Sequence, residues 1–386
     1  MRRQTPKQFA EQRHIATNRL ITRVIAEVSK RFNLFSKDTS RMTVKAAGDD
    51  GLFDLVEANR LSKWYYAELA DVIDWLKKII DSATKQAALI GLSELGYQHS
   101  LIFGRVITQS AQTVTEESMR RISDELRNAT GDRYFGNNRW NYSTAVWNLG
   151  QSARSQFDSA MVSARLDGKS AWDTAKGIEG FLSAGAECPQ WAMNRLYPEK
   201  GQVSSGERPT KDKTGLIGGS PCANSTGKPS VAYNALRLAR TEIAWVAGEA
   251  TRKSFAISPY VTGVNVLLSN THPKSDICDE VVANNPHPLN GSLSPSSASH
   301  TPIHPNCLCT EVSNSDKTLD EIADEVGGWV KGLPNQSLDK YATTLGFSVT
   351  DLSQATVNND IIAALLSPLS DWLLNNSGLH EKLLNL

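Results

Sequence analysis

Three cysteines and a histidine lie in one window of 32 residues, and they are the side chains best suited to chemistry. Cys278 lies in HPKSDICDEV, and His304, Cys307 and Cys309 lie in IHPNCLC. Thiolate and imidazole groups are the usual protein ligands of zinc. In an extended segment Cys307 and Cys309 project to the same face, which would bring two thiolates to one ion. Cys278 and His304 would then complete a tetrahedral site.

The spacing leaves the ligand set and the metal itself open. The last two cysteines, in IHPNCLC (the closing motif), are spaced Cys-x-Cys and not as the paired Cys-x-x-Cys of common zinc modules. Only one cysteine, Cys278, lies upstream of them in this window. Asp276, Asp279 or His272 can replace any one of the four ligands. Three interpretations follow for this window: a structural zinc site, buried or free thiols with hydrogen-bonded polar partners, or a disulfide.

The motifs of two familiar classes of zinc enzyme are absent from the chain. The sequence contains neither His-Glu-x-x-His nor a His-x-Glu followed by Pro-Cys-x-x-Cys. A Cys307 nucleophile assisted by His304 is chemically conceivable. Their three-residue separation beside a second thiol fits a structural site better, so we expect a protein that is not an enzyme.

Composition narrows the class of protein. The chain has 386 residues, with 41 Lys+Arg against 41 Asp+Glu. This length favours two or three domains, and zero net charge argues against a general nucleic-acid binder. No apolar run is long enough to span a membrane, and the N-terminus does not resemble a secretory signal. Five cysteines in so long a chain do not resemble a disulfide framework, so we expect a reducing cytoplasm during synthesis.

Prolines divide the chain into a helical part and a loop-rich part. None of the 15 prolines lies between Pro6 and Pro189, whereas twelve fall from Pro189 to Pro305. Because proline disrupts helix interiors, the gap predicts a helical region without strands. Apolar residues at steps of three and four agree. A helix of more than 40 residues would span about 60 Å, so we expect a kink near Gly91 or Gly96 or an elongated shape. The predicted helices cover 7–35, 53–95, 99–128, 139–166 and 170–184.

A second, mixed part follows a segment rich in Gly, Ser and Pro. We expect a helix over 231–257, strands over 262–268 and 307–313, and a long Cys/His loop between the strands. Thr318 and Glu321 resemble a capping box that begins an acidic helix over 319–331. The fold class is therefore α+β. The predicted division is a helical region (1–190), a flexible linker or loop (191–231), a small mixed domain (232–313) and an acidic tail of short helices (314–386).

Charge is distributed unevenly between the two ends. Residues 1–45 contain eleven Lys/Arg and three Asp/Glu, while the segment after Ser313 contains ten Asp/Glu and four Lys/Arg. A basic helix face in water accounts for the first excess. Such asymmetry also marks arms that bind partners, and the basic 1–45 segment is our candidate for contact with DNA or an acidic protein surface.

Three motifs in a fixed order resemble a known family. Arg240-Thr241-Glu242 in a helix, THPKSDICDEV (271–281) and HPNCLC (304–309), with Pro305 in the closing motif, resemble the head-morphogenesis domain of Mu F-like phage minor head proteins. The resemblance covers about residues 231–313. Many members carry two upstream cysteines, whereas this chain has Cys278 alone between Asp276 and Asp279.

The resemblance implies a virion protein present in few copies inside the head, near the portal, and made in the host cytoplasm. Such proteins act in head assembly and in DNA packaging or ejection, with the portal protein and other head proteins as partners. Zinc is the possible cofactor, and no membrane anchor is expected. The alternatives are a metal-dependent or Cys/His enzyme, or a toxin-like effector carried in the head.

The Arg-Thr-Glu motif has two interpretations of its own. Arg240 and Glu242 are two residues apart and so point to different faces of a helix. Each can pair separately at the surface, or both can serve inside the protein, for example by anchoring the loop that carries Cys278.

Overall fold

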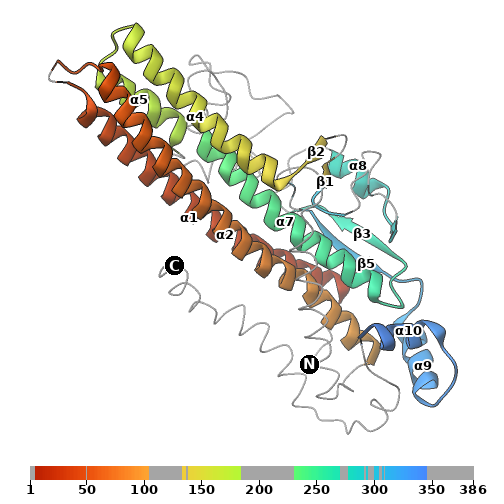
Figure 1. Ribbon diagram of the computed structural model, residues 1–386. Coiled ribbons are helices and arrows are strands. Elements are labelled where there is room, and N and C mark those ends of the chain that lie inside the picture. Colours follow the sequence, from red (N-terminus) through yellow and green to blue (C-terminus); the bar gives the residue numbers. More distant parts are fainter. Residues whose placement is uncertain are drawn as a thin grey trace.

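The computed structural model describes a long helical bundle that carries a small mixed region at one end (Figure 1). The described residues are 5–48, 50–103, 133–135, 138–183, 230–269, 277–290, 293, 300–303, 307 and 309–345. Within them the predicted α+β class is confirmed. The predictions made for residues 104–128, for the linker up to 229 and for the tail after 345 lie outside the described residues.

Two long helices form the length of the bundle. Helix α1 (Pro6–Ala46) begins at a capping box, in which the Thr5 side chain accepts from the Gln8 backbone and the Gln8 side chain accepts in return. Helix α2 (Leu55–Phe103) has 49 residues and so extends over about 73 Å. The elongated alternative therefore holds (Figure 1).

Gly91 and Gly96 both lie inside α2, so the predicted end of this helix at residue 95 is wrong. Gly91 lies where α2 contacts the helix that contains Ala247. A Cβ at Gly91 would lie 2.4 Å from the Ala247 carbonyl oxygen, so only glycine allows the two backbones to approach.

Three shorter helices complete the bundle. Helices α4 (Tyr142–Leu166), α5 (Ala171–Leu182) and α7 (Val231–Ile257) begin at the N-cap side chains of Asn141, Ser170 and Ser230. Helix α7 packs along α2 and α1, and its apolar side chains belong to the same core as theirs. The helix that we assigned to the mixed domain is thus part of the bundle core.

Strands are not confined to the region after the linker, so that expectation is wrong. Strands β1 (Arg133–Phe135) and β2 (Asn138–Trp140) pair antiparallel just before α4. In the sequence only Gly136 and Asn137 separate them, and such a pair is a hairpin signal that outweighs the helical period we extended to residue 139.

The mixed region is built on a small antiparallel sheet. Strand β3 (Gly263–Leu267) lies between β4 (His287–Pro288) and β5 (Thr310–Asn314), so the two predicted strands pair with each other. Helix α8 (Ile277–Ala283) precedes β4. Helix α9 (Leu319–Val330) begins at the predicted Thr318–Glu321 capping box, and α10 (Gln336–Leu345) packs beside it. None of the described helices meets the length and hydropathy that a membrane span requires.

Candidate metal centre

The structure brings the three cysteines of the sequence window together. Cys278 lies in the first turn of α8, and Cys307 and Cys309 precede β5. The three Sγ atoms all lie within 4.8 Å of one another. The Cys278 and Cys307 sulfurs are 3.7 Å apart, and the Cys309 backbone N–H donates to the Cys307 sulfur at 3.4 Å. This separation of the sulfurs excludes a formed disulfide, which needs about 2.05 Å.

Of the other candidate ligands, only Asp279 lies among the residues that the structure describes. Asp279 follows Cys278 on α8, but its carboxylate is not among the ligand atoms within 4.8 Å of one another. His272, Asp276, His304 and Pro305 lie outside the described residues.

The thiols lie in an apolar setting. Cys278, Cys307 and Cys309 are 0%, 3% and 8% exposed, and they pack in one cluster with Phe255 of α7 and Val264 of β3. Three sulfurs so close together, on two separate segments, form a buried cluster that can hold a metal ion.

The pKa values of two of the three thiols are raised, which opposes nucleophilic chemistry at those two cysteines. Hydrogen bonds with Cys307 and Cys309, together with burial, raise the pKa of Cys278 well above its ordinary value. For Cys309 the hydrogen bond with Cys278 lowers the pKa, but the hydrogen bond with Cys307 and burial outweigh it and the net shift is upward. Without a metal, Cys278 and Cys309 stay protonated at neutral pH, whereas a reactive cysteine needs a lowered pKa.

The Arg-Thr-Glu motif lies in the interior. Arg240, Thr241 and Glu242 are 2%, 0% and 2% exposed on α7, so the surface interpretation of the pair is wrong. The Thr241 hydroxyl donates to the Arg237 carbonyl oxygen at 2.8 Å, which satisfies it within its own helix.

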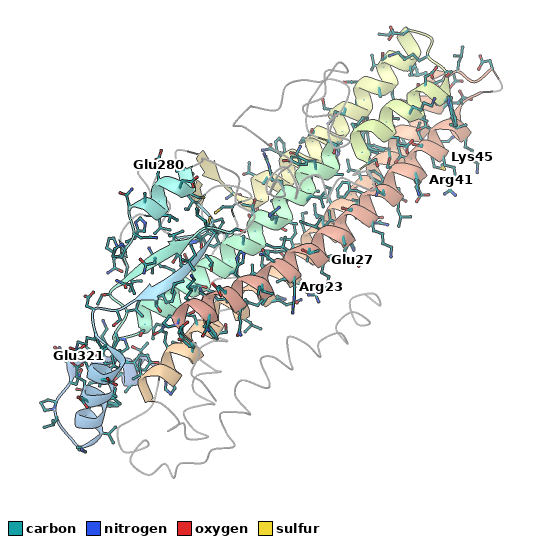
Figure 2. All side chains as sticks on the ribbon, turned by 180° about the vertical axis from the view of Figure 1, so that it is seen from behind. Arg23, Glu27, Arg41, Lys45, Glu280 and Glu321 are labelled. Carbon is teal, nitrogen blue, oxygen red and sulfur yellow. The ribbon has the colours of Figure 1, made fainter. Side chains whose placement is uncertain are left out.

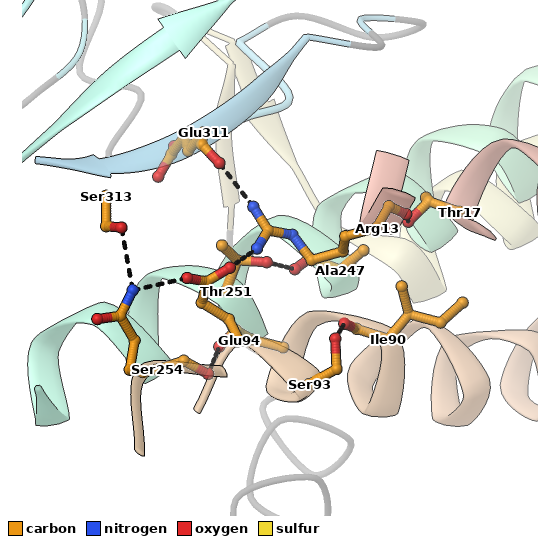
Figure 3. Close-up of polar contacts among 12 residues, drawn as sticks. Arg13, Thr17, Ile90, Ser93, Glu94, Ala247, Thr251, Ser254, Glu311 and Ser313 are labelled. Carbon is orange, nitrogen blue, oxygen red and sulfur yellow. Dashed lines mark hydrogen bonds and ion pairs between the residues drawn. The ribbon is translucent and has the colours of Figure 1, made fainter. Parts of the chain in front are cut away.

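A buried charge network joins the thiol segment to the bundle. Figure 3 shows Arg13 of α1 between Glu94 of α2 and Glu311 of β5. Arg13 forms an ion pair with Glu94 and donates to the Glu311 carbonyl oxygen at 2.6 Å. The Glu311 carboxylate accepts from Arg252 at 3.2 Å and from the Thr301 backbone N–H at 2.8 Å. Burial lowers the pKa of Arg13 to about 10, opposed by the charge of Glu311, so Arg13 stays charged at neutral pH.

A buried histidine holds the segment before the thiols against α7. His300 is 4% exposed; its Nε2 lies 2.9 Å from a Glu249 carboxylate oxygen and its Nδ1 lies 2.6 Å from the Thr301 carbonyl oxygen. Both partners are acceptors, so both ring nitrogens carry protons and the ring is an imidazolium. Burial lowers the pKa of His300, but the hydrogen bond and charge of Glu249 outweigh it and the net shift is upward.

Gly248 allows this close contact, because a Cβ there would lie 1.7 Å from the Thr301 carbonyl oxygen.

A small polar cavity lies where α1, α7 and the thiol segment meet. Its volume is about 40 Å³, and its lining includes His14, Asn18, Cys307 and Cys309. Burial lowers the pKa of His14, opposed by the nearby Cys307. The position of His14 beside the thiols has no signal in the local sequence.

Comparison with known proteins gives no relative for this chain: no protein-family model, curated protein or solved structure matches it. Function must therefore be inferred from the residues themselves.

The network residues are the ones that sequence reasoning missed. Arg13 lies 81 residues from Glu94 and 298 residues from Glu311, so no local spacing links them. Their only signal was indirect, since charged residues inside otherwise apolar helix faces require buried partners.

Proposed function

We propose that this chain is a phage minor head protein, a low-copy structural protein near the portal that acts in head assembly and in DNA packaging or ejection. The observation that carries the proposal is the meeting of Cys278 with Cys307 and Cys309, because these residues belong to two of the three motifs that resemble the Mu F-like family. The third motif, Arg240-Thr241-Glu242, lies buried on α7, as expected of an internal structural element.

The direct test is the location of the protein. Quantitative mass spectrometry of purified virions should find it at a few copies per portal, and heads assembled without it should package or eject DNA less efficiently. Its absence from purified virions would overturn the proposal.

The metal of the site is zinc in this proposal. Tetrahedral coordination with Zn–S distances of about 2.3 Å places sulfurs about 3.8 Å apart, close to the 3.7 Å between the Cys278 and Cys307 sulfurs. Zinc would supply a structural bond between α8 and the segment before β5. Cys278, Cys307 and Cys309 would hold it, and His304 of the closing motif is our sequence candidate for the fourth ligand.

Elemental analysis tests the zinc assignment. Protein purified without chelator should contain about one zinc per chain, and Cys307→Ser should release it, because binding requires the thiolates. Ser269→Ala is the matched control and should retain the metal, because Ser269 contacts Cys309 through its backbone, which alanine preserves. Less than about 0.2 zinc per folded chain would overturn the zinc assignment and identify the site as a cluster of thiols.

A basic stripe on α1 supports contact with DNA or with an acidic portal surface. The exposed cations recur on one side of the helix, and Figure 2 shows Arg23, Arg41 and Lys45 along it with Glu27 among them. The predicted arm is thus a helix packed in the bundle, and its test needs the whole chain. Replacing Arg23, Lys30 and Lys37 by Gln should weaken DNA binding and reduce its dependence on salt. Unchanged DNA binding in this variant would show that these α1 cations do not contact DNA.

The enzyme and effector alternatives have less support. A Cys/His nucleophile needs an accessible thiolate, whereas Cys307 is 3% exposed and its neighbours Cys278 and Cys309 have raised pKa values. No observation on the described residues favours a toxin-like activity.

A further inference from the structure

The outer face of α4 is unusual for a helix exposed to water. Trp147, Val162 and Leu166 are 62%, 53% and 80% exposed on it. Scattered single apolar residues are normal on protein surfaces, but three large ones on one helix face indicate a contact surface.

The polar positions of this face carry little charge. Between Trp147 and Val162 lie Gln151, Ser155 and Ser159, and the charged residues of this stretch are Arg154 and Asp158. An outer helix face is normally rich in charged side chains. Helix α1 also exposes three large apolar side chains, Ile15, Leu34 and Val44, but they lie among seven exposed cations (Lys7, Arg19, Arg23, Lys30, Lys37, Arg41, Lys45).

The exposed residues of α4 recur at the spacing of a helix-packing seam. Trp147, Gln151, Arg154, Asp158 and Val162 follow one another at steps of three or four, and Leu166 comes one turn later. Such steps place all of them on one face of the helix, where a second helix can pack at a small crossing angle.

This exposed face of α4, which we call the seam (Trp147, Gln151, Arg154, Asp158, Val162 and Leu166), is complementary to the same face of a second copy that runs antiparallel. A two-fold axis near Gln156 would place Trp147 opposite Leu166 of a second copy and Gln151 opposite its Val162. The same axis would place Arg154 opposite Asp158 of the second copy, and Asp158 opposite its Arg154. An isologous contact uses each pair twice, so both charge pairs are attractive and both ends are apolar.

Hollows beside α4 offer room for the side chains of the second copy. A hollow of about 520 Å³ between α2 and α4 is lined by Ile73, Val146 and Trp147, among others. A hollow of about 800 Å³ next along the helix is lined by Tyr66, Val162 and Leu166, among others. In the antiparallel arrangement Leu166 of the second copy faces the first hollow and its Trp147 faces the second.

We propose that α4 is a docking surface for a second copy of this chain, paired antiparallel about Gln156. This inference is independent of the proposed function. Helix α4 has 25 residues, so it is about 37 Å long and about 10 Å wide. That footprint is smaller than the roughly 800 Å² per partner of a stable interface, so the walls of the hollows must contribute and the dimer is weak, with a Kd in the micromolar range.

The oligomeric state of the full chain tests the proposal. Sedimentation velocity over about 1–100 µM should show a concentration-dependent monomer–dimer equilibrium. Trp147→Glu should weaken the dimer at least tenfold, because buried aromatic residues dominate such interfaces. Trp172→Glu is the matched control, since Trp172 is 61% exposed on α5 and lies outside the seam. A wild-type chain that stays monomeric over this range overturns the proposal, as does an equal loss in both variants.

A charge exchange tests the antiparallel arrangement itself. Arg154→Glu sets a glutamate against Asp158 of the second copy, and Asp158→Arg sets two arginines against each other, so each variant alone should dimerise at least tenfold more weakly. An equimolar mixture of the two variants restores both attractive pairs and should form the heterodimer at near wild-type strength.

The mixture also controls for local damage. Arg154 lies 5.5 Å from the Tyr66 ring and Asp158 accepts from the Tyr66 hydroxyl, so each substitution disturbs its own chain. Such damage persists on mixing, whereas a charge mismatch between copies does not. Failure of the mixture to dimerise, with both variants folded by circular dichroism, would overturn the antiparallel pairing.

Discussion

Glu311→Gln should destabilise the whole protein, because this one side chain ties three elements together in the interior. The Glu311 side chain is 1% exposed and its carboxylate accepts from Arg252 and from the Thr301 backbone. Glutamine retains an oxygen for Thr301 but removes the negative charge that lies 3.2 Å from the Arg252 guanidinium. Removing one partner of a buried ion pair costs about 3–5 kcal/mol. Since one of the two bonds survives in glutamine, we expect the lower end, a loss of about 3 kcal/mol.

The assay is urea denaturation followed by far-ultraviolet circular dichroism, with the free energy of unfolding obtained by linear extrapolation. The control is Asp74→Asn. Asp74 pairs with Lys77 at 3.0 Å, and their side chains are 66% and 47% exposed, so its loss should change the free energy by less than about 0.5 kcal/mol.

A second substitution separates the unpaired charge from other causes. In Arg252→Gln/Glu311→Gln both charges of this pair are removed together, so the double variant should be more stable than Glu311→Gln alone by about 1 kcal/mol or more. A loss below about 0.5 kcal/mol in Glu311→Gln, or a double variant no more stable than the single one, would refute the reasoning.

Three further predictions concern Gly248 and two buried histidines, His300 and His99. Gly248→Ala should cost about 1–3 kcal/mol in urea denaturation, since its Cβ meets the Thr301 carbonyl at 1.7 Å, whereas Gly180→Ala, with no atom within 4 Å of its Cβ, should be neutral or stabilising. Because the pKa of His300 is raised in the folded state, its contribution to stability is full below about pH 6.5 and is lost as pH rises through the folded value. His300→Gln should therefore flatten the decline of stability as pH rises above about 6.5. Burial lowers the pKa of His99 to about 4, so its contribution is present above about pH 6.5 and is lost as pH falls toward 4; His99→Gln should reduce this acid destabilisation by up to about 3 kcal/mol, and an unchanged pH profile would contradict the assignment.

Local signals in the sequence predicted much of the fold because they act over a few residues. The helix at 231–257 matches α7, and the Thr318–Glu321 capping box begins α9 as expected. Periodicity predicted α2 as well, although the helix runs on to Phe103. Glycine misled the prediction at Gly96, since the sequence does not distinguish a glycine that ends a helix from one that lies within it.

Position in space accounts for what the sequence could not predict. The thiols were found because their residue types are rare and close together along the chain. The role of Arg13 was not predicted, because Glu94 and Glu311 become its neighbours only after α1 packs against both α2 and the sheet. The same packing placed α7 in the bundle core, which no composition shift at the linker reveals.

The buried network at this junction is better explained by positional specificity than by stability. Apolar residues of equal volume often stabilise a core as well as a buried ion pair does, because desolvation offsets most of the attraction. A buried charged group, however, is tolerated only where it contacts a partner of opposite charge or a hydrogen-bonding group. A shift of α1 by one turn along α2 would separate Arg13 from Glu94 and from the Glu311 carbonyl at once, leaving buried charges unpaired. We infer that these charges fix the register of α1 against the strand that follows Cys309. Substituting Arg13 by Met should therefore disturb the thiol segment, which can be measured as faster alkylation of the buried cysteines. Alkylation at the wild-type rate in a folded Arg13→Met variant would show that packing alone sets the register.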